Sequence, residues 1–127
     1  MIKELFTTDV YVKVRRNRFE AKNLSTGSGW ESSNTQEPFT TDRLLVGQFS
    51  AAEPVLLKLT KEIQPKSLFK KRSKVVIQPM EMGDGGLSEV VERIFRELAL
   101  GAGAIKVILH IGKELSDSEA RDMLNGA

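Results

Sequence analysis

The 127-residue chain contains few residues whose types could carry out chemistry. Cysteine is absent and His110 is the single histidine, which excludes cysteine chemistry and any site built on two histidines. His110 lies near the carboxyl end of an apolar segment, where α/β sheets place ligand sites, but we expect a hydrogen-bonded structural role for it. Acidic side chains are spread over predicted helix surfaces, with no pair placed for acid–base catalysis: Glu62, Glu89, Glu92, Glu97, Asp117 and Glu119. We therefore predict no catalytic residue, no metal site and no cofactor.

Basic residues are the remaining candidates for a site, as a surface for an anionic partner. Six of them are clustered in two short segments: Arg15, Arg16, Arg18, Lys70, Lys71 and Arg72. Such clusters attract lipid headgroups or RNA by charge, although only Phe69 and Tyr11 lie near them in the sequence as stacking aromatics. Solvated loops before buried strands also carry such charges, and the sequence leaves both interpretations open.

A glycine-rich segment, 83–86 (Gly-Asp-Gly-Gly), precedes a predicted helix. Amide groups at a helix start can bind an anion, but no lysine followed by serine or threonine completes a phosphate-binding loop here. We favour a simple turn in which Asp84 caps the helix.

The first elements that position these residues are strands. Val10, Val12 and Val14 alternate with polar or amphipathic residues, which predicts a half-buried strand. A turn at 16–17 and a second strand over 18–24 complete an antiparallel hairpin. A third strand is expected at 29–33 or at 44–49, and residues 25–42 form an exposed polar loop.

Helices and parallel strands follow in the second half of the chain. A capping box at Ser50–Glu53 predicts a helix that ends at Pro65, and a short buried strand covers 74–78. A helix over 87–100 passes through Gly101 and Gly103 into a strand over 105–111 whose apolar run predicts burial on both faces. A second capping box, at 116–119, begins a helix that ends at 124.

This order, βββαβαβα, predicts a single α/β domain over residues 1–127 with a mixed five-stranded sheet and three helices, of the ribonuclease H-like type. The composition is that of an ordinary globular domain, with 40% hydrophobic and 28% charged residues and a net charge of +2. No apolar run approaches the roughly 20 residues of a membrane span, and the first residues lack a signal-peptide core. We expect a cytoplasmic location.

The stretch from Arg96 to Ala104, R-E-L-A-L-G-A-G-A, resembles a helix end in the first subdomain of bacterial actin-like proteins of the MreB family. The preceding helix, the strand over 74–79 and the opening residues 1–12 are similar in order and spacing. The resemblance implies an actin-like ATPase subdomain of ribonuclease H-like fold.

The same comparison shows departures from the nucleotide site of that family. The family carries Asp-x-Gly-Thr in the first hairpin, whereas the matching residues 12–18 here contain neither aspartate nor glycine. Val91 aligns with the glutamate that orients the attacking water, and the second lobe that closes the nucleotide cleft is missing. We therefore expect a domain that is degenerate relative to actin-like ATPases and is not an enzyme.

The leading functional hypothesis is a non-enzymatic, MreB-like domain that acts through protein–protein contacts or self-association, linked to bacterial cell shape. An open sheet edge and an uncovered helix face motivate it. The alternative is a basic surface module that binds anionic lipid or RNA. No small-molecule substrate is expected in either case.

Overall fold

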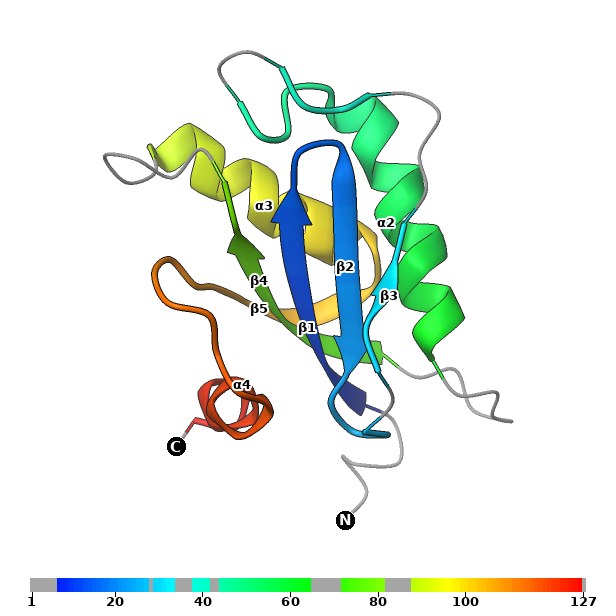
Figure 1. Cartoon of the computed structure of the whole chain (residues 1–127), viewed down its shortest axis with the longest axis vertical. Coiled ribbons are helices and arrows are strands. Elements are labelled where there is room, and N and C mark those ends of the chain that lie inside the picture. Colours follow the sequence, from blue (N-terminus) through cyan, green and yellow to red (C-terminus); the bar gives the residue numbers. More distant parts are fainter. Residues whose placement is uncertain are drawn as a thin grey trace.

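The computed structural model describes residues 7–27, 29–33, 38–41, 44–64, 72–81 and 88–126. Within these residues the chain forms five strands and three helices (Figure 1). In chain order they are β1 (Thr7–Arg15), β2 (Arg18–Asn23), β3 (Glu31–Ser32), α2 (Phe49–Ile63), β4 (Arg72–Pro79), α3 (Glu89–Gly101), β5 (Ala104–Leu109) and α4 (Asp117–Leu124). The predicted order of elements is confirmed.

The strands form one mixed sheet in the order β3-β2-β1-β4-β5. β2 is antiparallel to β1 and β3, whereas β4 is parallel to β1 and β5, as the element order predicts. The turn between β1 and β2 places Asn17 at a φ of 56°, a left-handed conformation that asparagine adopts more readily than most residues.

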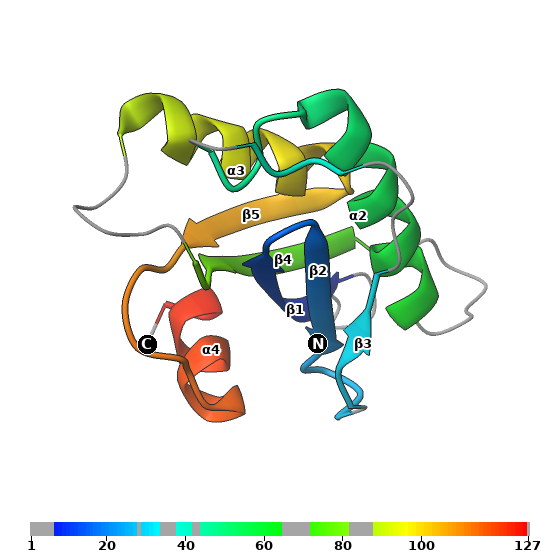
Figure 2. The same ribbon diagram turned by 45° about the horizontal axis from the view of Figure 1, so that its top comes forward.

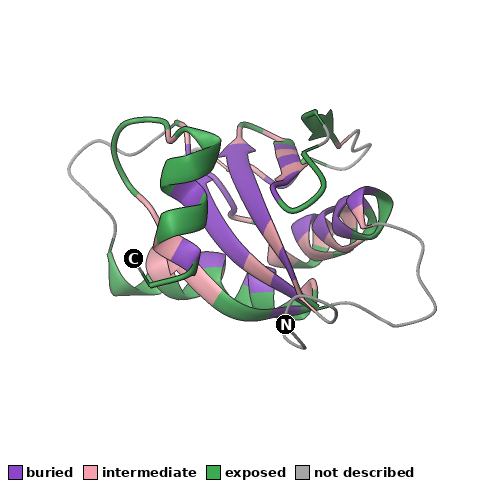
Figure 3. Cartoon of the chain, turned by 90° about the horizontal axis from the view of Figure 1, so that it is seen from below, coloured by how far each residue is buried: buried purple, intermediate pink, exposed green. Residues whose placement is uncertain are grey.

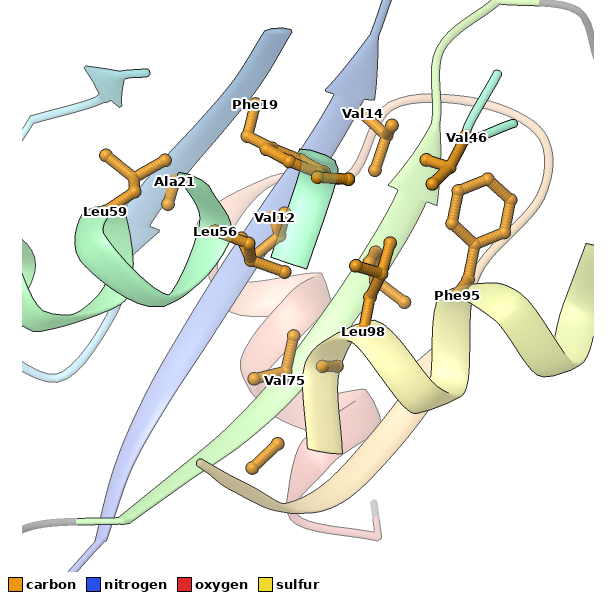
Figure 4. Close-up of a cluster of buried hydrophobic side chains, with 14 of the residues drawn as sticks. Val12, Val14, Phe19, Ala21, Val46, Leu56, Leu59, Val75, Phe95 and Leu98 are labelled. Atoms are coloured by element: carbon orange, nitrogen blue, oxygen red, sulfur yellow. The ribbon is translucent and has the colours of Figure 1, made fainter. Parts of the chain in front are cut away.

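Helices α2 and α3 cover one face of the sheet and α4 covers the other (Figure 2). The main core fills the space between the sheet and the first two helices (Figure 4), and its members include Val12, Val14, Phe19, Ala21, Leu56, Leu59, Val75, Phe95 and Leu98. Alternate residues of each strand reach this core because strand side chains point to opposite faces in turn.

A second, smaller cluster lies under α4. Tyr11 and Val76 from the sheet meet Ala120 and Leu124 from α4 there. β1 is consequently buried on both faces, and the prediction of a half-buried strand is wrong, because β1 lies at the centre of the sheet with helices on both sides. Figure 3 shows the buried strands between the helices and the exposed outer surface of α4.

The loop between β2 and α2 is only partly the exposed polar loop that the sequence predicts. Residues 25–27 and 29–32 are exposed, but Phe39 is fully buried and stacks on Phe19 with ring centroids 4.7 Å apart. The third strand lies within the first of the two predicted ranges, and residues 44–48 form a turn and a connection in which Leu45 and Val46 are buried. Burial of its apolar residues therefore folds this loop onto the core.

Helix α2 begins before the predicted capping box. The N–H groups of Gly47 and Gln48 both donate to the carbonyl of Phe39 (2.9 Å each), which fixes the chain before Ser50. Gln48 is the N-cap and makes no side-chain cap, so the prediction that Ser50 caps the helix is wrong. The capping box at the start of α4 is confirmed, with Ser116 as the N-cap.

The joint between α3 and β5 uses its two glycines differently. Gly103 has a φ of 101°, which a side chain resists, whereas Gly101 is an ordinary helical residue. A Cβ at Gly101 would lie 2.6 Å from a carboxylate oxygen of Glu53 in α2, so this glycine allows a close approach between helices. The prediction that β5 is buried on both faces is wrong, because β5 is an edge strand with exposed residues such as Ile105.

Candidate functional site

The predicted basic residues do not meet in one place. Arg15, Arg16 and Arg18 lie at the β1–β2 turn, whereas Arg72 begins β4 and pairs with Thr7 at the opposite end of β1. The eight positions from Thr7 to Arg15 separate them by about 26 Å at the usual rise per strand residue. Lys70 and Lys71 lie outside the described residues.

The hairpin cations are partly neutralised within the sheet. Glu20 pairs with both Arg15 (2.6 Å) and Arg18 (3.3 Å). The amides of the turn are also engaged, since the N–H of Arg16 donates to Glu81 (2.7 Å) and that of Asn17 to the hydroxyl of Thr40 (2.8 Å). A phosphate cradle needs free amides at this turn, and these two are already taken.

His110 makes a hydrogen bond within its own loop, in which Nε2 donates to the carbonyl of Lys113 (2.7 Å). The glycine-rich segment 83–86 lies outside the described residues. No three histidine or acidic side chains gather as metal ligands in the described part of the chain. None of the helices described is long and apolar enough to cross a membrane.

A different set of cations gathers on the sheet face under α4, and we call it the lysine face: Lys13, Lys22, Lys74 and Lys106. The ammonium group of each contacts an oxygen atom of the C-terminal segment 114–125. Lys13 contacts the carboxylate of Glu114, and Lys22 contacts the carboxylate of Asp117 (2.8 Å). Lys74 contacts the side-chain oxygen of Asn125 (2.6 Å), and Lys106 contacts the carbonyl of Leu124 (2.8 Å). α4 itself buries only Ala120 and Leu124. Polar contacts with the lysine face therefore add to the apolar contacts of Ala120 and Leu124 in attaching α4 to the sheet.

Lys13 is the most buried of these cations. Its cross-strand partner is Glu20, but the two hairpin arginines occupy that carboxylate, and Lys13 pairs with Glu114 instead. Its ammonium also lies 4.2 Å from the centre of the Trp30 ring, a cation–π contact. Burial lowers the pKa of Lys13, with a further lowering by the charges of Arg15 and Lys22 and an opposing effect of Glu20.

Tyr11 and Gln78 form a buried polar network beside Lys13. The Tyr11 hydroxyl donates to the side-chain oxygen of Gln78 and accepts from the N–H of Leu115 (3.2 Å). The Gln78 amide in turn donates to the carbonyl of Gly112 (2.9 Å). Burial raises the pKa of Tyr11, which keeps its hydroxyl protonated as a donor. The network fixes the segment before α4 onto β1 and β4.

The outer edge of β5 is the second feature of interest. The N–H of His110 donates to the carbonyl of Ile77 in β4 (3.0 Å). In a parallel strand the backbone N–H and C=O groups of successive residues point alternately toward one neighbouring strand and toward the other side. In the regular part of the pairing, which begins at Lys106 after a register shift, the N–H groups of the intervening residues therefore point away from β4: Val107 and Leu109.

Side chains beside this edge are apolar or hold it in place. Ile105 and Leu100 are 48% and 53% exposed, and Leu100 follows Arg96 by one turn of α3. Arg96 donates to the outward carbonyl of Val107 (3.2 Å). Among the described residues, this edge thus has open N–H groups flanked by exposed apolar side chains, while its Val107 carbonyl already accepts from Arg96.

A shallow groove of about 310 Å³ lies between β3 and α2. Its lining is mixed in polarity and comprises Ser32, Ser33, Pro54, Val55, Lys58, Leu59 and Glu62. It contains no cluster of cations or aromatic rings that matches the lysine face.

The sequence matches no family model. It is 36% identical over 124 residues to the uncharacterized protein YjaA of Escherichia coli (strain K12). The match covers 91% of this chain and 95% of that protein. Identity at this level over almost the full length of both proteins places them together, and the chain belongs to the YjaA family.

Proposed function

We propose that this chain is a non-enzymatic domain that acts through protein–protein contacts, and that its β5 edge pairs with β5 of a second copy. The open edge of β5 carries this proposal, because unpaired strand groups are a template for another strand. Two outward N–H groups in β5 are available, those of Val107 and Leu109, and exposed Ile105 and Leu100 beside them gain burial when a second copy covers them.

Pairing of β5 with itself across a two-fold axis is antiparallel and closes the assembly at two copies. It would join two five-stranded sheets into one. The same axis brings the side of α3 next to β5 toward its copy, and that side carries both charges in the pair Glu92–Arg96 (3.4 Å). Such a surface is compatible with its own copy because partners of opposite sign are available on both sides.

The engaged turn of the first hairpin supports the non-enzymatic part of the proposal. Actin-like ATPases bind phosphate with backbone amides at this turn, and here Glu81 and Thr40 take the amides of Arg16 and Asn17. The alternative function, a basic surface for anionic lipid or RNA, draws less support. Arg15 and Arg18 share Glu20, and Arg72 lies at the other end of the sheet.

The proposal includes a ribonuclease H-like fold related to the first subdomain of MreB-type proteins. The strand order, the reversed direction of β2 alone, and the placement of α2 and α3 opposite α4 support it. By this relationship a related cytoskeletal polymer is a further partner, with bacterial cell shape as the process. Co-sedimentation with MreB filaments tests this part: the chain is expected in the pellet, and a chain left in the supernatant contradicts the polymer partner alone.

Size-exclusion chromatography with light scattering over a wide concentration range tests the pairing of β5. We expect a dimer, which the variant Ile105→Lys converts to a monomer because it places a charge on an apolar side chain that the second copy covers. Val90→Lys is the matched control, since Val90 is 67% exposed and lies about three helical turns before Gly101, on the side of α3 that faces Glu53 of α2 and not β5. A wild-type monomer at the highest concentration, or equal dimerisation of both variants, would overturn the proposal. Thermal melts of both variants establish that they fold.

A further inference from the structure

Lys13 lies where α/β sheets place ligands. It is paired in register with Gln78 of β4, near the carboxyl ends of two adjacent parallel strands. The chain leaves β1 toward β2 on one side of the sheet and returns to β4 on the other, so the strand order switches direction between these two strands. Ligand sites in open α/β sheets lie beyond the carboxyl ends of the strands at such a switch point.

The counter-ion of Lys13 reaches it from the surface. The side chain of Lys13 is 7% exposed, whereas that of its partner Glu114 is 57% exposed. Glu114 belongs to the connection between β5 and α4, outside any helix or strand. A buried cation is thus neutralised by a carboxylate that enters from solvent, although Glu20 lies directly across the strand pair and is taken by arginines.

Aromatic rings and a second cation complete the surroundings of Lys13. Trp30 covers the ammonium and is 37% exposed, and Tyr11 meets the Trp30 ring edge-on at 5.2 Å between centroids. The ammonium of Lys22 lies 6.0 Å from the centre of the same ring. Lys22 is paired with Asp117 (2.8 Å), so Lys13 supplies the charge of this site and the partly exposed indole supplies a flat apolar wall beside it.

We propose that Lys13 and Trp30 form a binding site for the carboxylate or phosphate group of a small anionic ligand, and that Glu114 is its built-in occupant. The ligand anion takes the place of the Glu114 carboxylate on Lys13, and its apolar part lies against Trp30. This site is on the face of the sheet covered by α4 and is independent of the pairing of β5.

The internal occupant sets the apparent affinity of the site. A tethered group competes at an effective concentration on the order of millimolar, so an external anion binds weakly while Glu114 is present. Glu114→Gln removes the competing charge and leaves a buried ammonium without a counter-ion, which is strongly unfavourable unless an anion binds. We therefore expect this variant to bind a small anion at least about tenfold more tightly than the wild type.

Trp30 is the only tryptophan of the chain, so its fluorescence reports on the site directly. The experiment titrates inorganic phosphate and, separately, acetate into the protein at constant ionic strength, with chloride as the balancing anion. The matched control is Glu97→Gln, which changes the net charge equally on the exposed face of α3. A third protein, Glu114→Gln with Lys13→Met, removes the cation as well.

Tighter binding of phosphate or acetate by Glu114→Gln, with wild-type behaviour of Glu97→Gln, is the expected result, and the stronger of the two probes identifies the ligand group. Loss of this binding in the double variant assigns it to Lys13. Equal responses of Glu114→Gln and Glu97→Gln to both probes would overturn the proposal, even if the double variant does not fold. Binding that persists in a folded double variant would overturn it too.

Discussion

Replacing Tyr11 by phenylalanine removes a single hydroxyl group from the interior and leaves the apolar packing of the ring intact. That hydroxyl joins β1 to Gln78 in β4 and to the N–H of Leu115 before α4. Tyr11 and Gln78 are both fully buried, so water cannot replace the lost partner without opening the structure. The variant Tyr11→Phe therefore tests how firmly the polar network attaches the C-terminal segment to the sheet.

The size of the effect follows from the groups left behind. Each lost hydrogen bond costs about 1 kcal/mol, and a buried acceptor without a partner costs about 1–3 kcal/mol. Gln78 keeps its bond to the carbonyl of Gly112, so the amide is not wholly without partners. We expect Tyr11→Phe to lower the free energy of unfolding by about 2–3 kcal/mol.

Urea denaturation of the wild type and variants measures this loss of unfolding free energy, provided that the slope of the free energy against urea concentration is the same for all of them. Gln78→Leu and the double variant with Tyr11→Phe complete a double-mutant cycle. Because the double variant leaves no oxygen of Gln78 unpaired, it should be more stable than the sum of the single effects predicts, by about 1 kcal/mol.

The same variant carries a pH signature. Burial raises the pKa of Tyr11, with the Leu115 hydrogen bond lowering it and the charge of Glu119 raising it. A raised pKa in the folded state contributes stability below the unfolded value of about 10, and that contribution is lost as the pH rises above it. The stability difference between wild type and Tyr11→Phe should therefore be largest below about pH 10 and shrink above it. A difference within about 0.5 kcal/mol at neutral pH, or one that is constant through the alkaline range, would refute this account of the network.

Three further changes are expected to affect stability, each measurable by urea denaturation at low protein concentration. Phe95→Ala should cost about 3–5 kcal/mol because the ring is buried in the main core, whereas Val90→Ala on the exposed side of α3 should stay within about 0.5 kcal/mol; similar losses would contradict the assigned core. Gly103→Ala should cost about 1–3 kcal/mol at its φ of 101°, while Gly101→Ala in the helix should be close to neutral once the facing side chain moves, and the reverse order would contradict the assigned backbone. Ser116→Ala should cost about 1 kcal/mol by removing the cap of α4, and no change in stability would show that the cap is not formed.

Much of the fold could be predicted from local patterns. Alternating valines, a turn at Asn17 and the apolar face of α3 are short-range signals, and they correctly predict the order of the elements. The start of α2 differs from the prediction, because the carbonyl of Phe39, which lies in the preceding loop outside the capping motif, fixes it. The exposure of β5 was also missed, since a run of apolar residues does not distinguish a central strand from an edge strand.

The candidate site was harder to predict for the same reason. Lys13 alternates with valines and therefore reads as a solvent-facing residue, and nothing adjacent in sequence reveals Trp30 or Glu114 as its partners. The number of helices was a usable signal. Once α2 and α3 cover one face of the sheet, α4 must cover the other face, and it then lies over the polar residues of β1.

Hydrogen exchange of the Val107 amide, measured by NMR at low and high protein concentration, tests the pairing of β5 most directly. This N–H points away from β4, so only a partner strand protects it. We expect slow exchange at high concentration and fast exchange on dilution, while the amide of Val76 in the middle of the sheet is protected at both. Fast exchange of Val107 at every concentration, with Val76 protected throughout, would contradict the account.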